Sequence, residues 1–79
     1  MDISYDPKYN IAYIKLRDKR DTVKTLHISD EANIDISADG KIYGIELLNA
    51  NAQLKGFGRK LFSITNKSAG KTIRVPLPA

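Results

Sequence analysis

The sequence predicts an α+β domain built on an antiparallel β-sheet, and three observations lead to this fold class. Short segments rich in β-branched and aromatic residues recur along the 79 residues. Turn formers such as Asp-Pro, Asp-Gly and Ser-Ala-Gly separate these segments. One short stretch that begins near residue 50 has helical character instead. We therefore expect one domain over residues 1–79: a β-meander of about five strands, a short helix, and one or two short C-terminal strands.

The N-terminal part is expected to hold three strands. Strand character is found in residues 2–5, 11–16 and 22–28. The first two are joined by a turn at residues 6–10, where Pro7 fixes φ. The charged run 17–21 is typical of a solvated connection rather than a binding motif. His27 lies in the third strand without an obvious acid–base partner, so no catalytic role is predicted for it.

A hairpin is predicted around Asp39 and Gly40, and two registers are open there. The preferred register has a two-residue type I′ turn and pairs Ala38 with Lys41, Ile36 with Tyr43, Asp35 with Gly44, Ile34 with Ile45 and Asn33 with Glu46. The competing register has a three-residue loop with Gly40 as a bulge and pairs Asp35 with Tyr43 and Asn33 with Ile45. We favour the first because it keeps apolar side chains together on one face.

A short helix is predicted after the hairpin. Asn49 is placed to cap it over residues 50–55, and Gly56 to end it. A helix this short is not stable alone, so it must dock on the sheet. Two more strands are expected at residues 60–65 and 72–77, separated by a Ser/Asn/Gly turn.

Charge is distributed unevenly along the chain. Residues 1–46 hold seven bases and nine acids, a net −2, whereas residues 47–79 hold six bases and no acid, a net +6. The candidate polyanion-binding residues in the basic C-terminal extension, residues 55–79, are Lys55, Arg59, Lys60, Lys67, Lys71 and Arg74. The alternative is that this extension packs on the acidic part of its own chain.

Three polar residues, Asn33, Asp35 and Glu46, are candidates for a site on one face of the predicted sheet. A carboxylate-based hydrolase would need Asp35 and Glu46 to act together, but like charges this close repel and no further ligand or base joins them. The chain has no cysteine and a single histidine, which argues against a metal cluster. "SAGKT" and "GFG" each lack a glycine that a phosphate-binding or dinucleotide-binding loop requires, so no cofactor is expected.

Two ordered segments resemble a known family. "ISYDPKYNIAYIKL" is similar to its Tyr-Asp-Pro opening and Leu/Ala-Tyr-Ile strand, and "IDISADGKIYGIELLNA" is similar to its Asp-Gly, Gly-Ile-Glu and Leu-x-Ala run. On these motifs, residues 2–54 resemble a small prokaryotic family catalogued as domain of unknown function 2283. The resemblance implies a β-meander followed by a short helix. It also implies an antitoxin-like binding role, because some members are encoded beside toxin-like proteins. Asn10 and Ser37 stand where the family usually has acids.

These observations favour a noncatalytic protein-binding module, with an antitoxin-like role as its specific form. A nucleic-acid-binding protein that uses the basic extension is the alternative, and a hydrolase is the weakest hypothesis. We expect a homodimer, because a small domain with free sheet edges gains stability by burying them. The N-terminus lacks the pattern of a secretory signal and no apolar run is long enough to cross a membrane. We therefore expect a cytoplasmic protein without a membrane partner.

Overall fold

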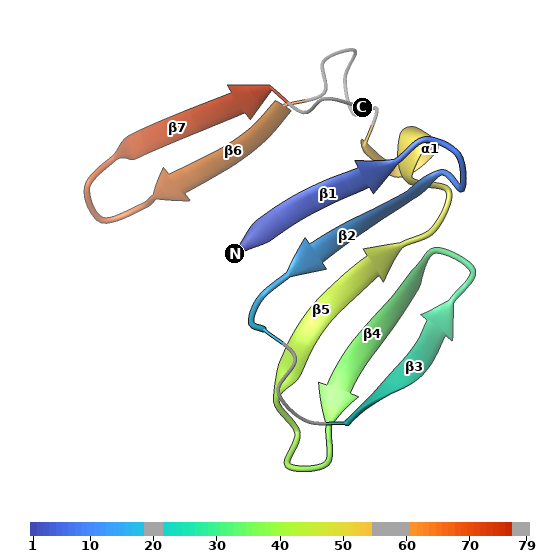
Figure 1. Cartoon of the computed structure of the whole chain (residues 1–79). Helices are drawn as coiled ribbons and strands as arrows, with labels where there is room; N and C mark the ends of the chain where they lie inside the picture. Colours follow the sequence, from blue (N-terminus) through green and yellow to red (C-terminus); the bar gives the residue numbers. More distant parts are fainter. Residues whose placement is uncertain (19–21, 55–60, 77–79) are drawn as a thin grey trace.

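The computed structural model describes residues 1–18, 22–54 and 61–76, which form seven strands and one short helix (Figure 1). The strands are β1 (Asp2–Asp6), β2 (Ile11–Lys15), β3 (Val23–Ser29), β4 (Ala32–Ser37), β5 (Ile42–Leu47), β6 (Leu61–Asn66) and β7 (Lys71–Pro76). The helix α1 (Ala50–Leu54) follows β5. β1 to β5 form one antiparallel sheet, while β6 and β7 form a separate hairpin. This architecture confirms the predicted α+β fold class.

The strand order in the sheet is β1-β2-β5-β4-β3, so β5 rather than β3 lies beside β2. The sheet is therefore a hairpin and a three-stranded meander joined side by side, which differs from a strict meander of consecutive strands. Burial explains the order. β5 contains two isoleucines, a tyrosine and a leucine and takes the centre, while β3, with lysine, threonine and histidine, lies at an edge.

The β4–β5 turn differs from the preferred prediction. Ile36 pairs with Ile42, and Gly40 has a φ of 87°, so a three-residue loop replaces the predicted two-residue type I′ turn. Ser37 closes this longer loop, because its amide donates to the Lys41 carbonyl at 2.9 Å and its Oγ accepts from the Lys41 amide at 3.1 Å. The prediction of the turn type was wrong because the backbone pattern alone does not reveal this side-chain bond.

A bulge in β5 nevertheless restores the preferred register further along. The register shifts between Asp35 and Ile36, which leaves Tyr43 as the extra residue in β5. The predicted pairings of Ile36 with Tyr43 and of Ala38 with Lys41 were therefore wrong, because Ile36 pairs with Ile42 and Ser37 lies opposite Lys41. The remaining pairs are those predicted: Asp35 with Gly44, Ile34 with Ile45, and Asn33 with Glu46.

Alternation along the paired strands gives the sheet two different faces. The sheet apolar face carries Ile3, Tyr5, Ala12, Ile14, Leu26, Ile34, Ile36, Ile42, Ile45 and Leu47, together with Lys24, which pairs with Ile36. The sheet polar face carries Asp2, Ser4, Tyr13, Lys15, Thr25, His27, Asn33, Asp35, Gly44 and Glu46. This division follows directly from the register, since pairing partners point to the same side.

Helix α1 is attached to the end of the sheet by Asn10 in the β1–β2 turn. The Asn10 carbonyl accepts from the Ala50 amide at 2.9 Å, and its Oδ1 accepts from the Asn51 amide at 2.8 Å. Asn10 thus caps the helix, whereas the predicted cap, Asn49, uses its Oδ1 to accept from Asn10 Nδ2 at 3.1 Å. The sequence could not reveal a cap whose side chain lies 41 residues from the amide that it binds. The predicted helix end at Gly56 lies outside the described residues.

The C-terminal hairpin extends away from the five-stranded sheet (Figure 1). Its strands pair from Leu61 opposite Pro76 to Asn66 opposite Lys71, close to the predicted positions. Alternation places Phe62, Ile64, Ile73 and Val75 on one side, which we call the hairpin apolar face. The opposite side carries Ser63, Thr65, Thr72 and Arg74, and the two threonine hydroxyls there are 3.0 Å apart.

The described part of the chain has a small core. Its buried apolar residues are Ala12, Tyr43 and Ala50, and no large side chain among the described residues is fully enclosed. The isoleucines of the sheet apolar face are only partly buried or exposed. None of the described helices has the length and apolar character needed to cross a membrane.

Candidate functional site

Asp35 stands at the centre of the sheet polar face and is only 8% exposed. The Tyr13 hydroxyl donates to its Oδ2 at 2.8 Å, and the Thr25 hydroxyl donates to its Oδ1 at 2.7 Å. These bonds connect β2, β4 and β3, because Tyr13 reaches across the intervening strand β5. A buried carboxylate requires such donors. Burying it without hydrogen bonds would lower the free energy of unfolding by roughly several kcal/mol, because the charge loses its hydration.

Gly44 makes this arrangement possible. It lies opposite Asp35 on β5, and a Cβ built at Gly44 would be 2.1 Å from the Tyr13 hydroxyl oxygen and 2.3 Å from the ring carbon that bears it. Any side chain at this position would therefore occupy the space of the Tyr13 ring. The glycine in the middle of β5 is explained by the close approach of an aromatic ring and not by a turn.

A second row of polar side chains runs beside the first. Asn33 Nδ2 donates to Glu46 Oε1 at 3.1 Å, and Asn33 Oδ1 lies 2.9 Å from His27 Nδ1. His27 Nε2 also lies 4.0 Å from an Asp30 carboxylate oxygen. The β3–β4 register sets His27 opposite Asn33, so its ring has a hydrogen-bond partner, although the Asn33 amide is neither an acid nor a base.

Of the three predicted polar candidates, the structure joins two directly. Asn33 and Glu46 are bonded to each other, whereas Asp35 lies in the next row and is bonded to Tyr13 and Thr25. The shared face was predicted correctly from alternation. Tyr13 and Thr25 were not predicted as part of the group, although a glycine opposite a buried acid was a usable signal for a large neighbouring side chain.

Lys15 and its neighbours form the edge of this face. Lys15 Nζ lies 3.3 Å from Asp18 Oδ1 and 3.3 Å from Asp2 Oδ2. Hydrogen bonds to Asp18 and then to Asp2 raise the pKa of the Lys15 ammonium above its ordinary value. The residues concerned are exposed, so this ion-pair cluster contributes little to the free energy of unfolding.

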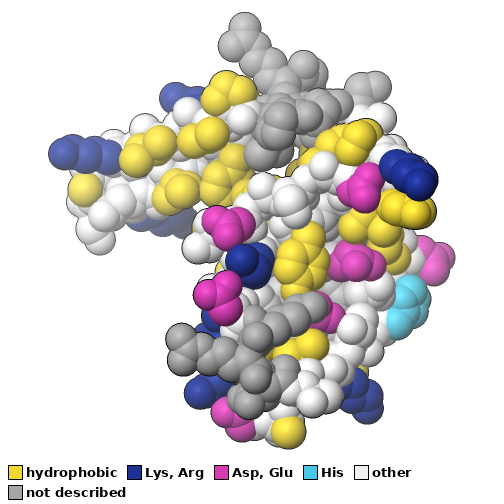
Figure 2. All heavy atoms as spheres, in the orientation of Figure 1, with side chains coloured by type: hydrophobic (Ala, Val, Ile, Leu, Met, Phe, Trp, Pro, Cys, Tyr) yellow, Lys and Arg dark blue, Asp and Glu magenta, His cyan; other side chains and the backbone are white. Residues whose placement is uncertain are grey.

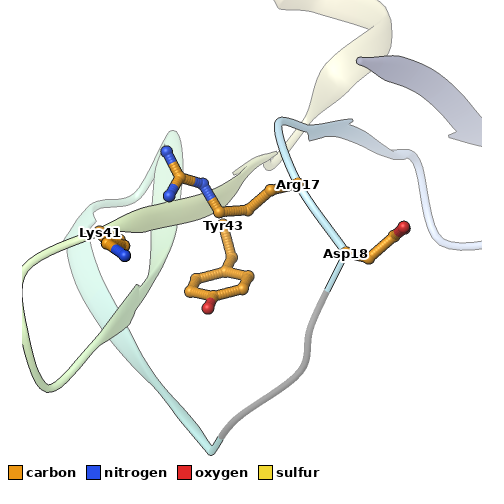
Figure 3. Close-up of a pocket in the computed structure, with 4 residues that line it drawn as sticks. All are labelled: Arg17, Asp18, Lys41 and Tyr43. Carbon is orange, nitrogen blue, oxygen red and sulfur yellow. The ribbon is translucent and has the colours of Figure 1, made fainter.

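A cavity of about 460 Å³ lies beside the β4–β5 turn and is lined by Arg17, Asp18, Lys41 and Tyr43 (Figure 3). The Arg17 guanidinium carbon is 5.7 Å from the centre of the Tyr43 ring, a distance typical of a cation–π contact. Lys41 Nζ is 3.5 Å from Asp39 Oδ2. The cavity thus has charged walls of both signs around one buried tyrosine.

The chemistry available to the sheet polar face is limited by its internal hydrogen bonds. Asp35 is buried, and each of its oxygens accepts a hydroxyl proton, so it serves as an acceptor that holds three strands together. The described residues contain no group of three or more histidines and acids placed to hold a metal ion. The hydrogen bonds of Asp35 thus join β2, β3 and β4 across this face.

The predicted polyanion-binding residues fall into two groups. Lys55, Arg59 and Lys60 lie outside the described residues. Lys67, Lys71 and Arg74 lie on the C-terminal hairpin and are exposed. Figure 2 shows basic side chains at the far end of this hairpin, while acidic ones gather over the five-stranded sheet.

The hairpin apolar face carries exposed apolar residues on two paired strands. Ile64 is 51% exposed, Ile73 64% and Val75 48%. Hydrophobic side chains run along the hairpin in Figure 2. Exposed apolar residues that are contiguous, rather than scattered, mark interaction sites on soluble proteins.

Comparison with known proteins identifies one family. The family described as Protein of unknown function (DUF2283) matches residues 2–51, which span β1 through the start of α1. No curated protein matches the chain, and no solved structure does. The match covers the five-stranded sheet and leaves the C-terminal hairpin outside it.

Proposed function

The chain belongs to the DUF2283 family, and from that premise we propose that it is a noncatalytic protein-binding module whose contact surface is the hairpin apolar face. The specific partner we propose is a small toxin-like protein encoded beside it, which would make the role antitoxin-like. The exposure of Ile64, Ile73 and Val75 is the observation that supports this function.

Two physical arguments favour a protein as the ligand of the hairpin. A two-stranded hairpin without a covering layer is only marginally stable in water, so a partner that covers its apolar face would also stabilise it. The outer edges of β6 and β7 offer backbone amides and carbonyls in addition, because each strand pairs only with the other in this sheet. A partner strand could therefore join the hairpin while its side chains cover the isoleucines.

A catalytic role receives less support. The carboxylates that a hydrolase would use are bonded within the fold, Asp35 to two hydroxyls and Glu46 to an asparagine amide. A general acid or base must instead be free to exchange a proton with substrate. We therefore propose that the sheet polar face stabilises the module rather than performing chemistry.

The test uses two arginine substitutions on neighbouring residues of β7. Ile73→Arg places a charge on the hairpin apolar face, while Thr72→Arg places the same charge on the opposite side. We expect co-expression with the product of the adjacent gene to give a complex that survives purification with wild type and Thr72→Arg but not with Ile73→Arg. Equal binding by all three proteins would contradict the proposed surface, and no complex with wild type would contradict the proposed partner.

Nucleic-acid binding is the second candidate, and the exposed bases Lys67 and Lys71 near the hairpin turn favour it. Phosphate contacts make affinity fall steeply as salt rises. If this function holds, Lys67→Gln and Lys71→Gln together will lower the affinity for random oligonucleotides and flatten its salt dependence. Ile73→Arg, which adds a base, will not weaken such binding, so this one variant separates the two functions.

A further inference from the structure

The sheet apolar face lacks a second layer within the described chain. Among the described elements outside the sheet, α1 makes the main contact with it, against β2 at one end. Ile34 and Ile45 pair at the middle of the face and are only partly buried. Domains are normally built from at least two packed layers, because a sheet with one apolar face must bury that face.

The dimensions of the molecule agree with a missing layer. Its smallest extent is 19 Å and its radius of gyration is 14.1 Å, whereas a compact chain of this length has a radius of about 11.6 Å. The accessible surface is 6140 Å², against about 4,800 Å² for a typical folded monomer of 8.8 kDa. The excess of about 1,300 Å² belongs to the whole chain, including the C-terminal hairpin, and it is larger than the roughly 800 Å² that each partner buries in a standard interface.

We propose that the sheet apolar face docks on the same face of a second copy, so that two sheets form a β-sandwich with twofold symmetry. Stacked sheets lie about 10 Å apart, with the side chains of both inner faces interdigitating between them. The pair of Ile34 and Ile45 lies near the centre of this contact, and the polar groups bonded to Asp35 stay on the outer surface.

A second copy is favoured over another protein for two reasons. A chain whose described core contains only two alanines and one tyrosine needs a cover whenever it is folded, and a second copy is present whenever the chain is made. The distribution of charge along the chain also favours a second copy in this arrangement. Residues 1–46 carry a net −2, so two sheets can approach closely, while two copies of residues 47–79, each +6, would repel.

This contact is independent of the proposed function, because it uses the sheet and leaves the hairpin apolar face free. Ile73→Arg should therefore abolish partner binding, while the chain should still sediment as a dimer. Loss of the dimer in that variant would overturn the sheet-to-sheet arrangement, whatever became of partner binding.

The test begins with sedimentation equilibrium of the unmodified chain, which we expect to give twice the monomer mass at micromolar concentration. Because the chain has no cysteine, single cysteines can then report which faces meet. Ile34→Cys and Ile45→Cys should each give covalent dimers with a short bismaleimide. Glu46→Cys, the next residue on the same strand but on the opposite face, is the matched control and should give none.

The outcomes are distinct. A monomer in the first measurement overturns the proposal before any variant is made. A dimer that cross-links through Glu46→Cys, or through Ile73→Cys but neither sheet isoleucine, overturns the proposed face. Cross-links at both Ile34→Cys and Ile45→Cys, with none at Glu46→Cys, support it.

Discussion

The five-stranded sheet and the C-terminal hairpin are both antiparallel β-structures, but they differ in the side-chain contacts between their strands. In the sheet, polar groups on one face are bonded to one another across strands, as Tyr13, Asp35 and Thr25 show. In the hairpin, one exposed threonine pair is the cross-strand side-chain bond between β6 and β7 in the described structure, and the isoleucines face solvent. The polar face of the sheet is thus held by its own hydrogen bonds, whereas the hairpin has one apolar side available to a partner.

The largest expected difference between the two regions is the loss of stability when a glycine is substituted. Gly44→Val would force a side chain into the Tyr13 ring, so we expect a loss of at least about 3 kcal/mol in the free energy of unfolding, measured in urea. Gly70, in the hairpin, has a φ of 65° and nothing within 4 Å of a built Cβ. Gly70→Ala should therefore meet no steric collision and cost only the strain of its left-handed conformation, about 1 to 2 kcal/mol.

A double-mutant cycle checks the cause assigned to Gly44. If the collision with Tyr13 dominates, Gly44→Ala will cost much less in a Tyr13→Leu background than in wild type. Equal costs in both backgrounds would show that the glycine is required for some other reason.

The next largest effect is expected at Asp35. Asp35→Ala leaves the Tyr13 and Thr25 hydroxyls without their acceptor, and we expect a cost of about 2 to 3 kcal/mol. The matched change in the hairpin is Thr72→Val, which removes an exposed hydroxyl bond and should cost about 0.5 kcal/mol or less. Urea unfolding followed at one protein concentration measures both, and similar costs would contradict the contrast between the two regions.

Local signals in the sequence were sufficient to predict the strands and the helix, and part of the candidate site. Alternation and turn residues predict strand positions close to those observed, and the predicted pairing of Asp35 with Gly44 is confirmed. That register also placed Asn33 and Glu46 side by side. These features depend on residues close in the chain, for which period and turn chemistry carry the information.

Features that depend on distant residues were missed. To predict the strand order, one must know that β5 pairs with β2. The connecting residues 17–21 contain no local pattern that indicates which strand lies beside β2. The bond from Tyr13 to Asp35 spans 22 residues and crosses a strand. The three-residue loop was missed for a subtler reason, because a bulge at Tyr43 cancels its effect on every later pair.

Asn10 offers a smaller test, at the junction between sheet and helix. Asn10→Ala removes the cap on α1 and places alanine at a φ of 56°, so we expect a cost of about 2 kcal/mol. Asn10→Gly removes the same side chain without the backbone strain and should cost about 1 kcal/mol. If the two variants are equally stable in urea, the left-handed conformation at this position contributes nothing.

The smallest expected effect concerns pH and the β4–β5 turn. The Ser37 hydroxyl donates to Asp39, and this bond, assisted by Lys41, lowers the pKa of the Asp39 carboxyl from its usual 3.8. Because the folded pKa is depressed, the stabilisation is present above pH 3.8 and is lost as pH falls through the lower folded value. Ser37→Ala should therefore unfold at a lower urea concentration than wild type at neutral pH, and the gap should narrow below pH 3.8 without closing, since the Ser37 bond to the Lys41 amide does not titrate. A gap that stays constant from neutral to acidic pH would show that the carboxylate has no part in closing the turn.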